Sequence, residues 1–374
     1  MTPAGAFREE ARDGEARAGV LTLAHGEVRT PTFMPVGTRG VVKSLDSADL
    51  RTVGAQMILS NTYHLMLRPG AEIVAEMGGL HGFMAWDGPI LTDSGGYQVF
   101  SLDPIVTEQH AEFRSTYDGS RVALSPEESM RVQQLLGADV AMVLDVLVGL
   151  PADRQVITEA MNQTLRWSER AKNSHQRRDQ VLFGIVQGGV EDDLRAESAR
   201  RTADLEFAGF GIGGLSVGES APERNRAIEA VVPELPAEKV RYVMGLGDSE
   251  GVLDAIARGC DLFDCVWPTR LARHGRILTS AGDYNLRRSE FTTDAGPLAD
   301  DCRCPTCRSH SRSYLRHLLA TNELTVFRLA SLHNLWYTLG LLESARNAIA
   351  SGSFADFRAE VVERRNGGRR AEDG

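Results

Sequence analysis

The sequence lacks several features that would assign it to particular classes of protein. No run of about 18 apolar residues occurs, so no membrane-spanning helix is expected. Residues 1–10 contain no basic segment followed by an apolar one, so we expect no secretory signal peptide and a cytoplasmic protein. Positive charge is not in excess, because the formal net charge is −10, and this disfavours non-specific nucleic-acid binding through bulk charge.

Lysine is nearly absent, and arginine therefore supplies almost all of the positive charge. Lys43, Lys172 and Lys239 are the only lysines in the chain. The stretch from Trp267 to Leu318 contains nine arginines and five acidic residues, which gives it a local net charge of +4. Such a stretch is typical of a phosphate-binding surface or of an ordinary solvated surface, and charge alone does not separate the two.

Short apolar stretches of strand character recur along the chain, and most of them end in Gly, Asp, Asn or Gln. Eight are expected to be strands: residues 32–36, 56–61, 89–93, 139–145, 181–187, 210–215, 241–246 and 262–266. Helical patterns lie between most of them, at 125–136, 152–176, 191–206, 221–232 and 249–258. Eight alternating units predict an α/β fold of the (β/α)8 TIM-barrel type, with its site at the carboxyl ends of the strands. An open doubly wound sheet is the alternative, but no G-x-G-x-x-G follows a first strand.

The alternating rhythm ends after Trp267. We expect residues 1–266 to form the barrel, 267–350 a metal-stabilised subdomain that completes it, and 351–374 a C-terminal helix with a disordered tail from Asn366. Within this part, a small β region is predicted at 271–288 and helices at 314–320, 325–351 and 354–365.

Two apolar stretches each deliver one carboxylate to the end of a strand. Asp264 precedes Pro268, which cannot donate to a sheet, and Asp93 precedes the glycine pair 95–96. Burying a carboxylate at the end of a strand costs free energy unless the group has a partner or a function. Taken singly, however, either aspartate is typical of a residue that caps a turn. Two carboxylates at one barrel mouth are what a glycosyl-transferring site requires.

The barrel prediction brings further polar groups to the same mouth. Asp145 can accept two hydrogen bonds from N1–H and the exocyclic amine of a guanine-like base, and Gln187 can donate to its carbonyl oxygen. The backbone at 214–215 can read the remaining edge, because glycine allows close approach. Tyr97 and Met244 can enclose the ring, although each alone is more typical of core packing.

Three of the five cysteines lie within six residues, at Cys302, Cys304 and Cys307. Clustered thiols in a reducing compartment favour metal binding, and thiolates select zinc. The residues leave the fourth ligand open among three histidines: His310, His317 and His333. Four protein ligands would close the site, so a structural Zn2+ is expected rather than a catalytic one.

The motifs at 58–65, 91–102, 183–189, 213–219, 242–245 and 263–270, with the cysteine cluster, resemble those of the tRNA-guanine transglycosylase family. The resemblance runs from about residue 7 to about residue 350 and keeps the family's order of motifs. It implies a (β/α)8 barrel with a zinc subdomain, usually as a homodimer. It also implies exchange of guanine 34 in the anticodon of certain tRNAs for a 7-deazaguanine, in queuosine biosynthesis.

The resemblance further implies a role for each site residue. Asp264 resembles the nucleophile that attacks C1′ of the ribose, and Asp93 the general acid/base. The substrate-binding residues would be Asp145, Gln187, Gly214 and Leu215 for the base, Tyr97 and Met244 for stacking, and Asn61, Gln98 and Tyr242 around the sugar and nucleophile, together with Ser94. Arg270 and Arg273 resemble tRNA contacts, and His333 resembles the fourth zinc ligand.

The chain departs from the family pattern at three positions. Val146-Leu147 stands where bacterial members carry Glu-Cys, and eukaryotic members, which accept queuine, have an apolar residue in place of Leu147. Val217 follows the bacterial pattern, so preQ1 is expected as the incoming base, with queuine as the alternative. Asp248 stands where bacterial members often place a lysine that contacts the anticodon. A non-catalytic tRNA-binding subunit ranks low, because Asp93, Asp145 and Asp264 are all retained.

Overall fold

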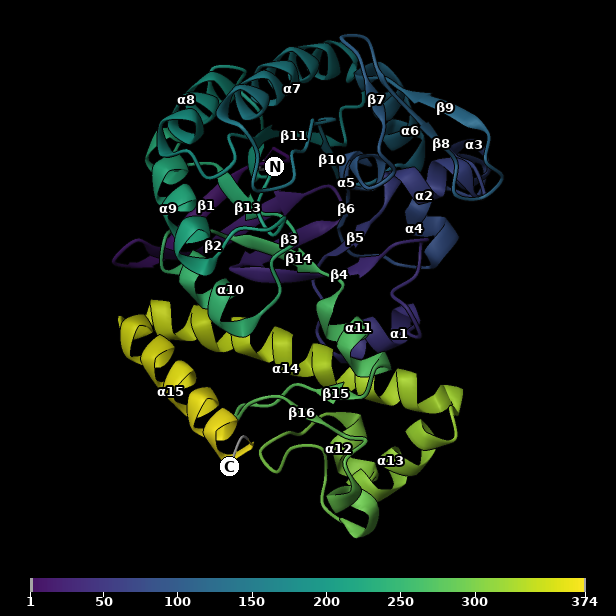
Figure 1. The fold of residues 1–374 in the computed structure, drawn as a ribbon, viewed down its shortest axis with the longest axis vertical. Helices are drawn as coiled ribbons and strands as arrows, with labels where there is room; N and C mark the ends of the chain where they lie inside the picture. Colours follow the sequence, from purple (N-terminus) through teal and green to yellow (C-terminus); the bar gives the residue numbers. More distant parts are fainter. Residues whose placement is uncertain (1–2, 373–374) are drawn as a thin grey trace.

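The computed structural model describes residues 3–372, with side chains up to residue 367. Its centre is formed by eight parallel strands: β4 (Thr32–Gly37), β5 (Ile58–Ser60), β6 (Ile90–Thr92), β10 (Val140–Met142), β11 (Val181–Val186), β12 (Gly209–Ile212), β13 (Val240–Val243) and β14 (Leu262–Cys265). They close into a barrel in the order β10-β11-β12-β13-β14-β4-β5-β6 (Figure 1). Each strand overlaps a predicted stretch, so the TIM-barrel prediction is confirmed.

Helices surround the barrel, as the alternating pattern predicted. The larger ones are α6 (Pro126–Leu136), α7 (Arg154–Ser174), α8 (Asp192–Ala203), α9 (Ala221–Val231) and α10 (Ser249–Ile256), and short ones are α1 (Ser47–Thr52), α2 (Thr62–Leu67), α3 (Ala71–Glu76) and α4 (Gly79–Met84). Ser125 caps α6, because its hydroxyl oxygen accepts a hydrogen bond from the Glu128 N–H at 3.2 Å.

An antiparallel sheet of β1 (Phe7–Asp13), β2 (Ala16–Leu23) and β3 (Gly26–Thr30) contacts the amino ends of the barrel strands. Arg17 of β2 donates to the carboxylate of Asp261, directly before β14, at 2.9 Å, and both side chains are fully buried. The ring of His25 lies 2.9 Å from the carboxylate of Asp139, directly before β10. Since the added sheet is anchored at the amino ends, it leaves the carboxyl ends of the strands free for a site.

The connection between β6 and β10 adds structure on the carboxyl side that the sequence did not predict. It contains the short helix α5 (Gly96–Phe100) and a small antiparallel sheet of β7 (Ile105–Val106), β8 (Ala111–Arg114) and β9 (Arg121–Leu124). Helix α5 begins three residues after Asp93, and it therefore carries Tyr97 and Gln98 at the barrel mouth.

The C-terminal part contains α11 (Trp267–Arg273), β15 (Arg276–Ile277), β16 (Tyr284–Asn285), α12 (Pro305–Ser309), α13 (Arg312–Ala320), α14 (Leu324–Ala350) and α15 (Phe354–Glu372), with short 3-10 turns at Val232–Glu234 and Ser289–Thr293. The predicted β region at 271–288 is right for the β15–β16 hairpin and wrong for residues 271–273, which lie in α11. Pro268 occupies the first turn of α11, where its missing N–H is harmless, so it starts a helix here as well as ending a strand.

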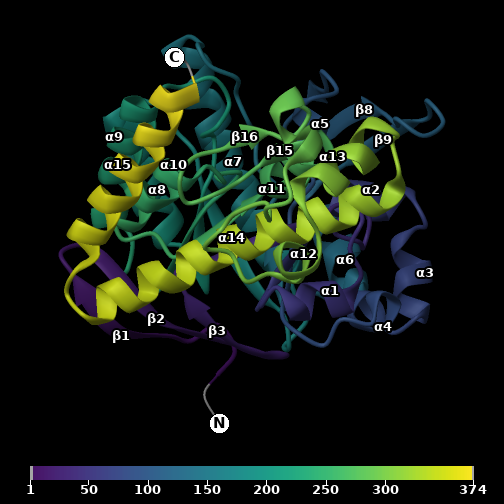
Figure 2. The ribbon, with the colours of Figure 1, turned by 90° about the horizontal axis from the view of Figure 1, so that it is seen from below.

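Helix α14 joins the C-terminal part to the barrel. It runs alongside the barrel in both views (Figures 1 and 2). Val326 and Leu329, near its start, belong to a small hydrophobic core with Leu286 and Leu315, whereas Leu335 and Leu342 belong to the main core. The domain boundaries at 266 and 350 therefore stay a prediction.

Two expectations concern the end of the chain and membrane insertion. Helix α15 continues to Glu372, past the predicted helix end at 365, and residues 373–374 lie outside the described range. The disordered tail stays a prediction. No helix in the described range is both long and apolar enough to cross a bilayer.

Candidate active site

A cavity of about 240 Å3 opens at the carboxyl ends of the barrel strands. Asp93 and Asp264, predicted from strand ends that are far apart in the chain, both line its wall. Nine other residues predicted to bind substrate also line it: Asn61, Ser94, Tyr97, Gln98, Asp145, Gly214, Leu215, Tyr242 and Met244. The structure therefore brings both carboxylates and most of the predicted base-binding residues together in one pocket.

Asp264 lies near the end of β14 and is held by one of its two carboxylate oxygens. Its Oδ1 atom accepts hydrogen bonds from the Tyr242 hydroxyl at 2.5 Å and from the Gly245 N–H at 2.7 Å. Among the described residues, no group donates to its Oδ2 atom. Burial raises the pKa of Asp264, and the two hydrogen bonds oppose this shift. The carboxylate is thus fixed in orientation with one oxygen left for an incoming group.

Asp93 follows β6 and accepts hydrogen bonds on both carboxylate oxygens. The Thr62 N–H donates to Oδ1 at 2.9 Å, the Gly95 N–H donates to the same oxygen at 3.1 Å, and the Asn61 amide donates to Oδ2. Asn61 has a fixed amide orientation, because its own oxygen caps α2 by accepting from the His64 N–H at 3.0 Å.

The pKa of Asp93 is raised to about 7, first by burial and then by the negative charge of Asp264, while the hydrogen bonds lower it. The repulsion between Asp93 and Asp264 means that the two carboxylates share one electrostatic environment. A carboxyl group with a pKa near neutrality can both give and take a proton at physiological pH.

Asp145 lies beyond the end of β10 and is buried, whereas Asp93 and Asp264 are partly exposed. Its carboxylate accepts from the Gln187 amide at 2.7 Å and from the Ser94 hydroxyl at 3.2 Å. Burial raises its pKa, and these hydrogen bonds oppose the shift. A Cβ atom at Gly96 would lie 2.4 Å from Oδ1 of Asp145, so a larger residue there would displace this carboxylate. Gln187 itself is buried and is not part of the cavity wall.

The backbone at Gly213 and Gly214 forms another wall. Gly214 has a φ of 66°, and a Cβ atom there would lie 2.3 Å from the Gln187 side-chain oxygen. The fully buried Arg195 of α8 donates to the carbonyl oxygens of Gly213 at 2.7 Å and Gly214 at 3.2 Å, and burial lowers its pKa to about 10. Sequence reasoning missed Arg195, because no pattern separates it from the exposed arginines of the same helix.

The two predicted stacking residues lie at different depths. Tyr97 on α5 is 60% exposed, whereas Met244, directly after β13, is half-buried with its sulfur 3.6 Å from the position a Gly213 Cβ would take. Both line the cavity. A flat ring could therefore contact one residue near the opening and the other inside.

The predicted tRNA contacts lie beside the cavity rather than in its wall. Arg270 is exposed on α11, and Arg273, one turn later, is half-buried and donates to the Thr269 carbonyl oxygen at 2.9 Å. Burial and the nearby charge of Arg270 lower the pKa of Arg273. Neither forms an ion pair within the described residues, so both charges are left for a ligand.

A family model described as queuine tRNA-ribosyltransferase matches residues 13–367. The chain belongs to this family. It is 50% identical over 353 residues to the queuine tRNA-ribosyltransferase of Nitrosomonas europaea, covering 94% of this chain and 95% of that protein. Identity is 48% over 354 residues with the enzyme of the same name from Pelotomaculum thermopropionicum, covering 94% and 96%. The resemblance to an enzyme family, inferred from the motifs, is confirmed.

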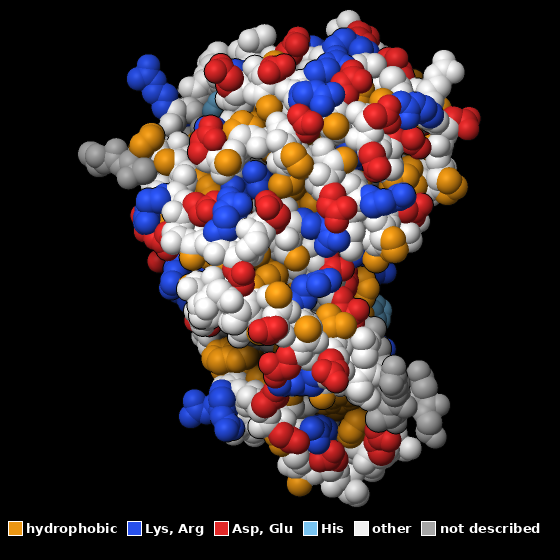
Figure 3. Space-filling model, turned by 90° about the vertical axis from the view of Figure 1, so that its left-hand side faces the viewer, with side chains coloured by type: hydrophobic (Ala, Val, Ile, Leu, Met, Phe, Trp, Pro, Cys, Tyr) orange, Lys and Arg blue, Asp and Glu red, His pale blue; other side chains and the backbone are white. Residues whose placement is uncertain are grey.

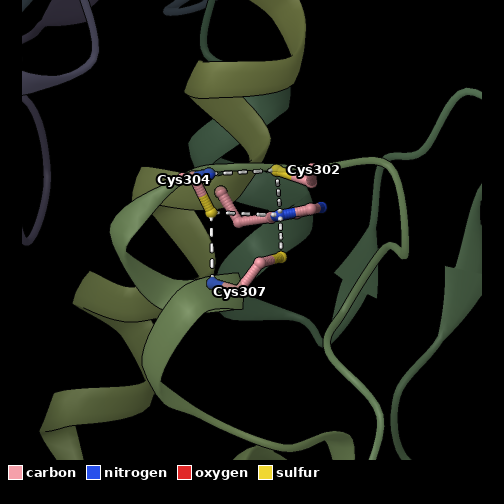
Figure 4. A group of neighbouring side chains, drawn as sticks. Cys302, Cys304 and Cys307 are labelled. Carbon is pink, nitrogen blue, oxygen red and sulfur yellow. Dashed lines mark hydrogen bonds between the residues drawn. The ribbon is translucent and has the colours of Figure 1, made fainter.

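This queuine tRNA-ribosyltransferase family member also has a candidate metal centre outside the cavity. Nδ1 of His333, on α14, lies 3.6 Å, 3.5 Å and 3.2 Å from the sulfur atoms of Cys302, Cys304 and Cys307. Figure 4 shows the three labelled cysteines converging from the loop before α12 and from its first turns. The four ligand atoms all lie within 4.8 Å of one another, whereas His310 and His317 are not in the group.

The donor set fits a tetrahedral metal ion of zinc type. Three sulfur atoms and one imidazole nitrogen form a closed set of four ligands. The other ring nitrogen of His333 lies 2.9 Å from the Leu278 carbonyl oxygen, which directs Nδ1 toward the sulfurs. The backbone N–H groups of Cys304 and Cys307 donate to sulfur atoms of the cluster, as expected around thiolates.

The residues on which the choice of incoming base depends lie in the cavity. Leu147 and Val217 both line it, so they can influence which base fits. Asp248 caps α10, where its carboxylate accepts from the Gly251 N–H at 2.7 Å. This cap gives the acidic side chain at position 248 a local structural role.

Proposed function

We propose that this protein is a tRNA-guanine transglycosylase that replaces guanine 34 of its tRNA substrates with a 7-deazaguanine, most favourably preQ1. The observation that carries the proposal is that Asp93, Asp145 and Asp264 line one cavity. The relatives' shared name, queuine tRNA-ribosyltransferase, supports it.

In the first half-reaction Asp264 acts as the nucleophile. Its free Oδ2 atom attacks C1′ of ribose 34, an ester bond forms between enzyme and ribose, and the bond from C1′ to guanine breaks. Asp93 in its protonated form gives its proton to the departing base. The Tyr242 and Gly245 hydrogen bonds hold Asp264 in position for attack.

In the second half-reaction the roles reverse. The ionised Asp93 takes a proton from the incoming base, whose nitrogen attacks C1′ and displaces the Asp264 carboxylate. Two displacements at one carbon retain the configuration of the glycosidic bond. The near-neutral pKa of Asp93 suits a group that must donate a proton in one step and accept one in the next.

Base recognition falls to Asp145 and its neighbours. The ionised carboxylate can accept from N1–H and the exocyclic amine of the base. The Gln187 amide lies behind the cavity wall and donates to Asp145, so it would support base binding by orienting that carboxylate. The backbone at 213–215, braced by Arg195, would meet the remaining edge.

We further propose that Zn2+ is held by Cys302, Cys304, Cys307 and His333. When bound, the ion would supply structural cross-linking rather than Lewis-acid chemistry, because four protein ligands leave no position for substrate. It would connect the loop before α12 to α14, which packs against the barrel core.

The proposal includes a cytoplasmic protein that acts as a homodimer on the anticodon loop of tRNA. Queuine remains the alternative incoming base, because the apolar Leu147 lines the cavity. The deciding experiment incubates the protein with tRNA and either preQ1 or queuine, then identifies nucleoside 34 by mass spectrometry. Conversion of guanosine 34 with preQ1 supports the proposal, conversion with queuine alone supports the alternative, and no conversion with either base overturns both.

A further inference from the structure

An aromatic ring with two arginines lies on the rim of the barrel and belongs to none of the sites described above. Tyr117 lies in the turn between β8 and β9. The guanidinium carbon of Arg68 lies 4.8 Å from the centre of its ring, and that of Arg39 lies 5.4 Å away. Guanidinium groups at these distances are attracted by the negative face of the ring, so Tyr117 restrains both side chains.

Both arginines are exposed, and neither forms an ion pair anywhere in the described part of the chain. Many other surface arginines are paired with carboxylates, for example Arg51 with Asp87 and Arg131 with Glu128. Figure 3 shows the side of the molecule away from β8 and β9, where acidic and basic side chains are likewise interspersed. Arg39 and Arg68 differ from these paired arginines, because they share one aromatic ring and no carboxylate.

The remaining polar neighbour does not neutralise the pair. Nδ1 of His64 lies 3.1 Å from the Tyr117 hydroxyl. Burial lowers the pKa of His64, and the charge of Arg39 lowers it further. The Asp118 carboxylate, next in the chain, accepts hydrogen bonds from Ser120 instead. The group thus presents two positive charges with free N–H donors.

The position of these residues relates them to the cavity. Thr38, directly before Arg39, lines the cavity, and so does Asn61, the residue that caps the helix ending before Arg68. A nucleotide strand that places one base in the cavity would pass this rim with its backbone. Each linkage carries one negative charge, and arginine is suited to phosphate because its planar N–H donors can bind two oxygens at once.

We propose that Arg39 and Arg68, restrained by Tyr117, form a binding site for a backbone phosphate of the RNA strand next to the nucleotide in the cavity. This inference rests on the proposed function and adds a second contact region to the one at α11. Pre-stacking on Tyr117 reduces the conformational freedom that the arginines lose when they bind.

The test measures tRNA binding against salt concentration for the wild-type protein and for Arg39→Ala, Arg68→Ala and the double variant. Each lost phosphate contact should weaken binding about 10-fold and reduce the slope of log K against log salt by about one. Binding of free guanine should not change, because no cavity residue is altered. Arg121→Ala is the matched control, since Arg121 lies on the same hairpin but is paired with Glu112.

Two further variants separate charge from structure. Arg39→Lys with Arg68→Lys should restore part of the salt dependence, and Tyr117→Phe, which keeps the ring, should bind tRNA like the wild type. An unchanged slope in the double alanine variant, or loss of free guanine binding in it, would overturn the inference. Failure of the wild-type protein to exchange any base in tRNA would instead overturn the proposed function.

Discussion

The hydroxyl group of Tyr242 donates a hydrogen bond of 2.5 Å to the same Asp264 oxygen that accepts the Gly245 N–H. Burial and the negative charge of Asp264 raise the pKa of Tyr242 well above its usual value, so the phenol remains a donor at physiological pH. One carboxylate oxygen is therefore occupied by donors from β13 and the loop after it, and the other is left for chemistry.

Replacing Tyr242 by phenylalanine should lower kcat about 10- to 100-fold, the usual effect of removing a hydrogen bond to a charged group. Because the lost bond favours the ionised form, the pKa of Asp264 should rise. The acid limb of the rate profile should then move to higher pH, as kinetics across a pH series would measure. Tyr284→Phe is the control, since the Tyr284 hydroxyl donates to Leu298 outside the cavity; equal effects of both variants would contradict the prediction.

Asp264→Asn should lower the rate of base exchange by about three orders of magnitude or more, because an amide cannot act as the nucleophile. The amide oxygen can still accept from Tyr242 and Gly245, so the fold should be retained. Labelled guanine incorporation and a denaturing gel for the covalent tRNA adduct measure the two losses. Incorporation at a rate comparable with Asp87→Asn, an exposed control, would show that the nucleophile is another residue.

Asp93→Asn should slow exchange about 10²- to 10⁴-fold, the usual contribution of general acid–base catalysis. It should also change how stability depends on pH. A carboxyl pKa raised by folding means that the folded state binds the proton more tightly than the unfolded state. The free energy of unfolding of the wild type therefore falls as pH rises toward the folded pKa of about 7. In Asp93→Asn this decrease should be absent, because the amide does not titrate.

Thermal melting measures that difference directly. The melting temperature of Asp93→Asn relative to wild type should increase between about pH 4 and about pH 7 and stay level above that. A constant difference over this range would mean that Asp93 titrates near its ordinary value.

Cys304→Ser should lose bound zinc and lower the melting temperature by roughly 10 °C or more, because metal-binding energy contributes to folding. Elemental analysis and calorimetry measure both effects, and a chelator should reproduce them in the wild type. Cys260→Ser is the control, since Cys260 is buried but lies outside the cluster. Full zinc content with unchanged melting would exclude the structural metal.

Arg273→Ala should weaken tRNA binding about 10-fold and reduce the salt slope by about one, because one phosphate contact is lost. Free guanine binding should be unaffected, since Arg273 is not in the cavity wall. Titrations at several salt concentrations measure both, with Arg200→Ala as the control because Arg200 is paired with Glu234. If log K for tRNA binding has the same slope against log salt concentration in both variants, Arg273 does not contact tRNA.

The sequence by itself determined the barrel, because strand and helix patterns depend on neighbours only a few residues apart. The same locality explains why Ser125 was found as a helix cap and why the three cysteines of 302–307 were recognised as metal ligands. Asp93 and Asp264 could be chosen because parallel strands in a barrel all end at one mouth.

Only the tertiary structure decided relations between residues distant in the chain. The cysteine spacing left three histidines open, and the structure brought His333, the one that the family resemblance implied, to the cysteines. It buried Arg195 behind the glycine turn. It also raised the pKa of Asp93 and placed two unpaired arginines on Tyr117. Burial and charge interactions depend on distance in space, and no local pattern in the sequence records that distance.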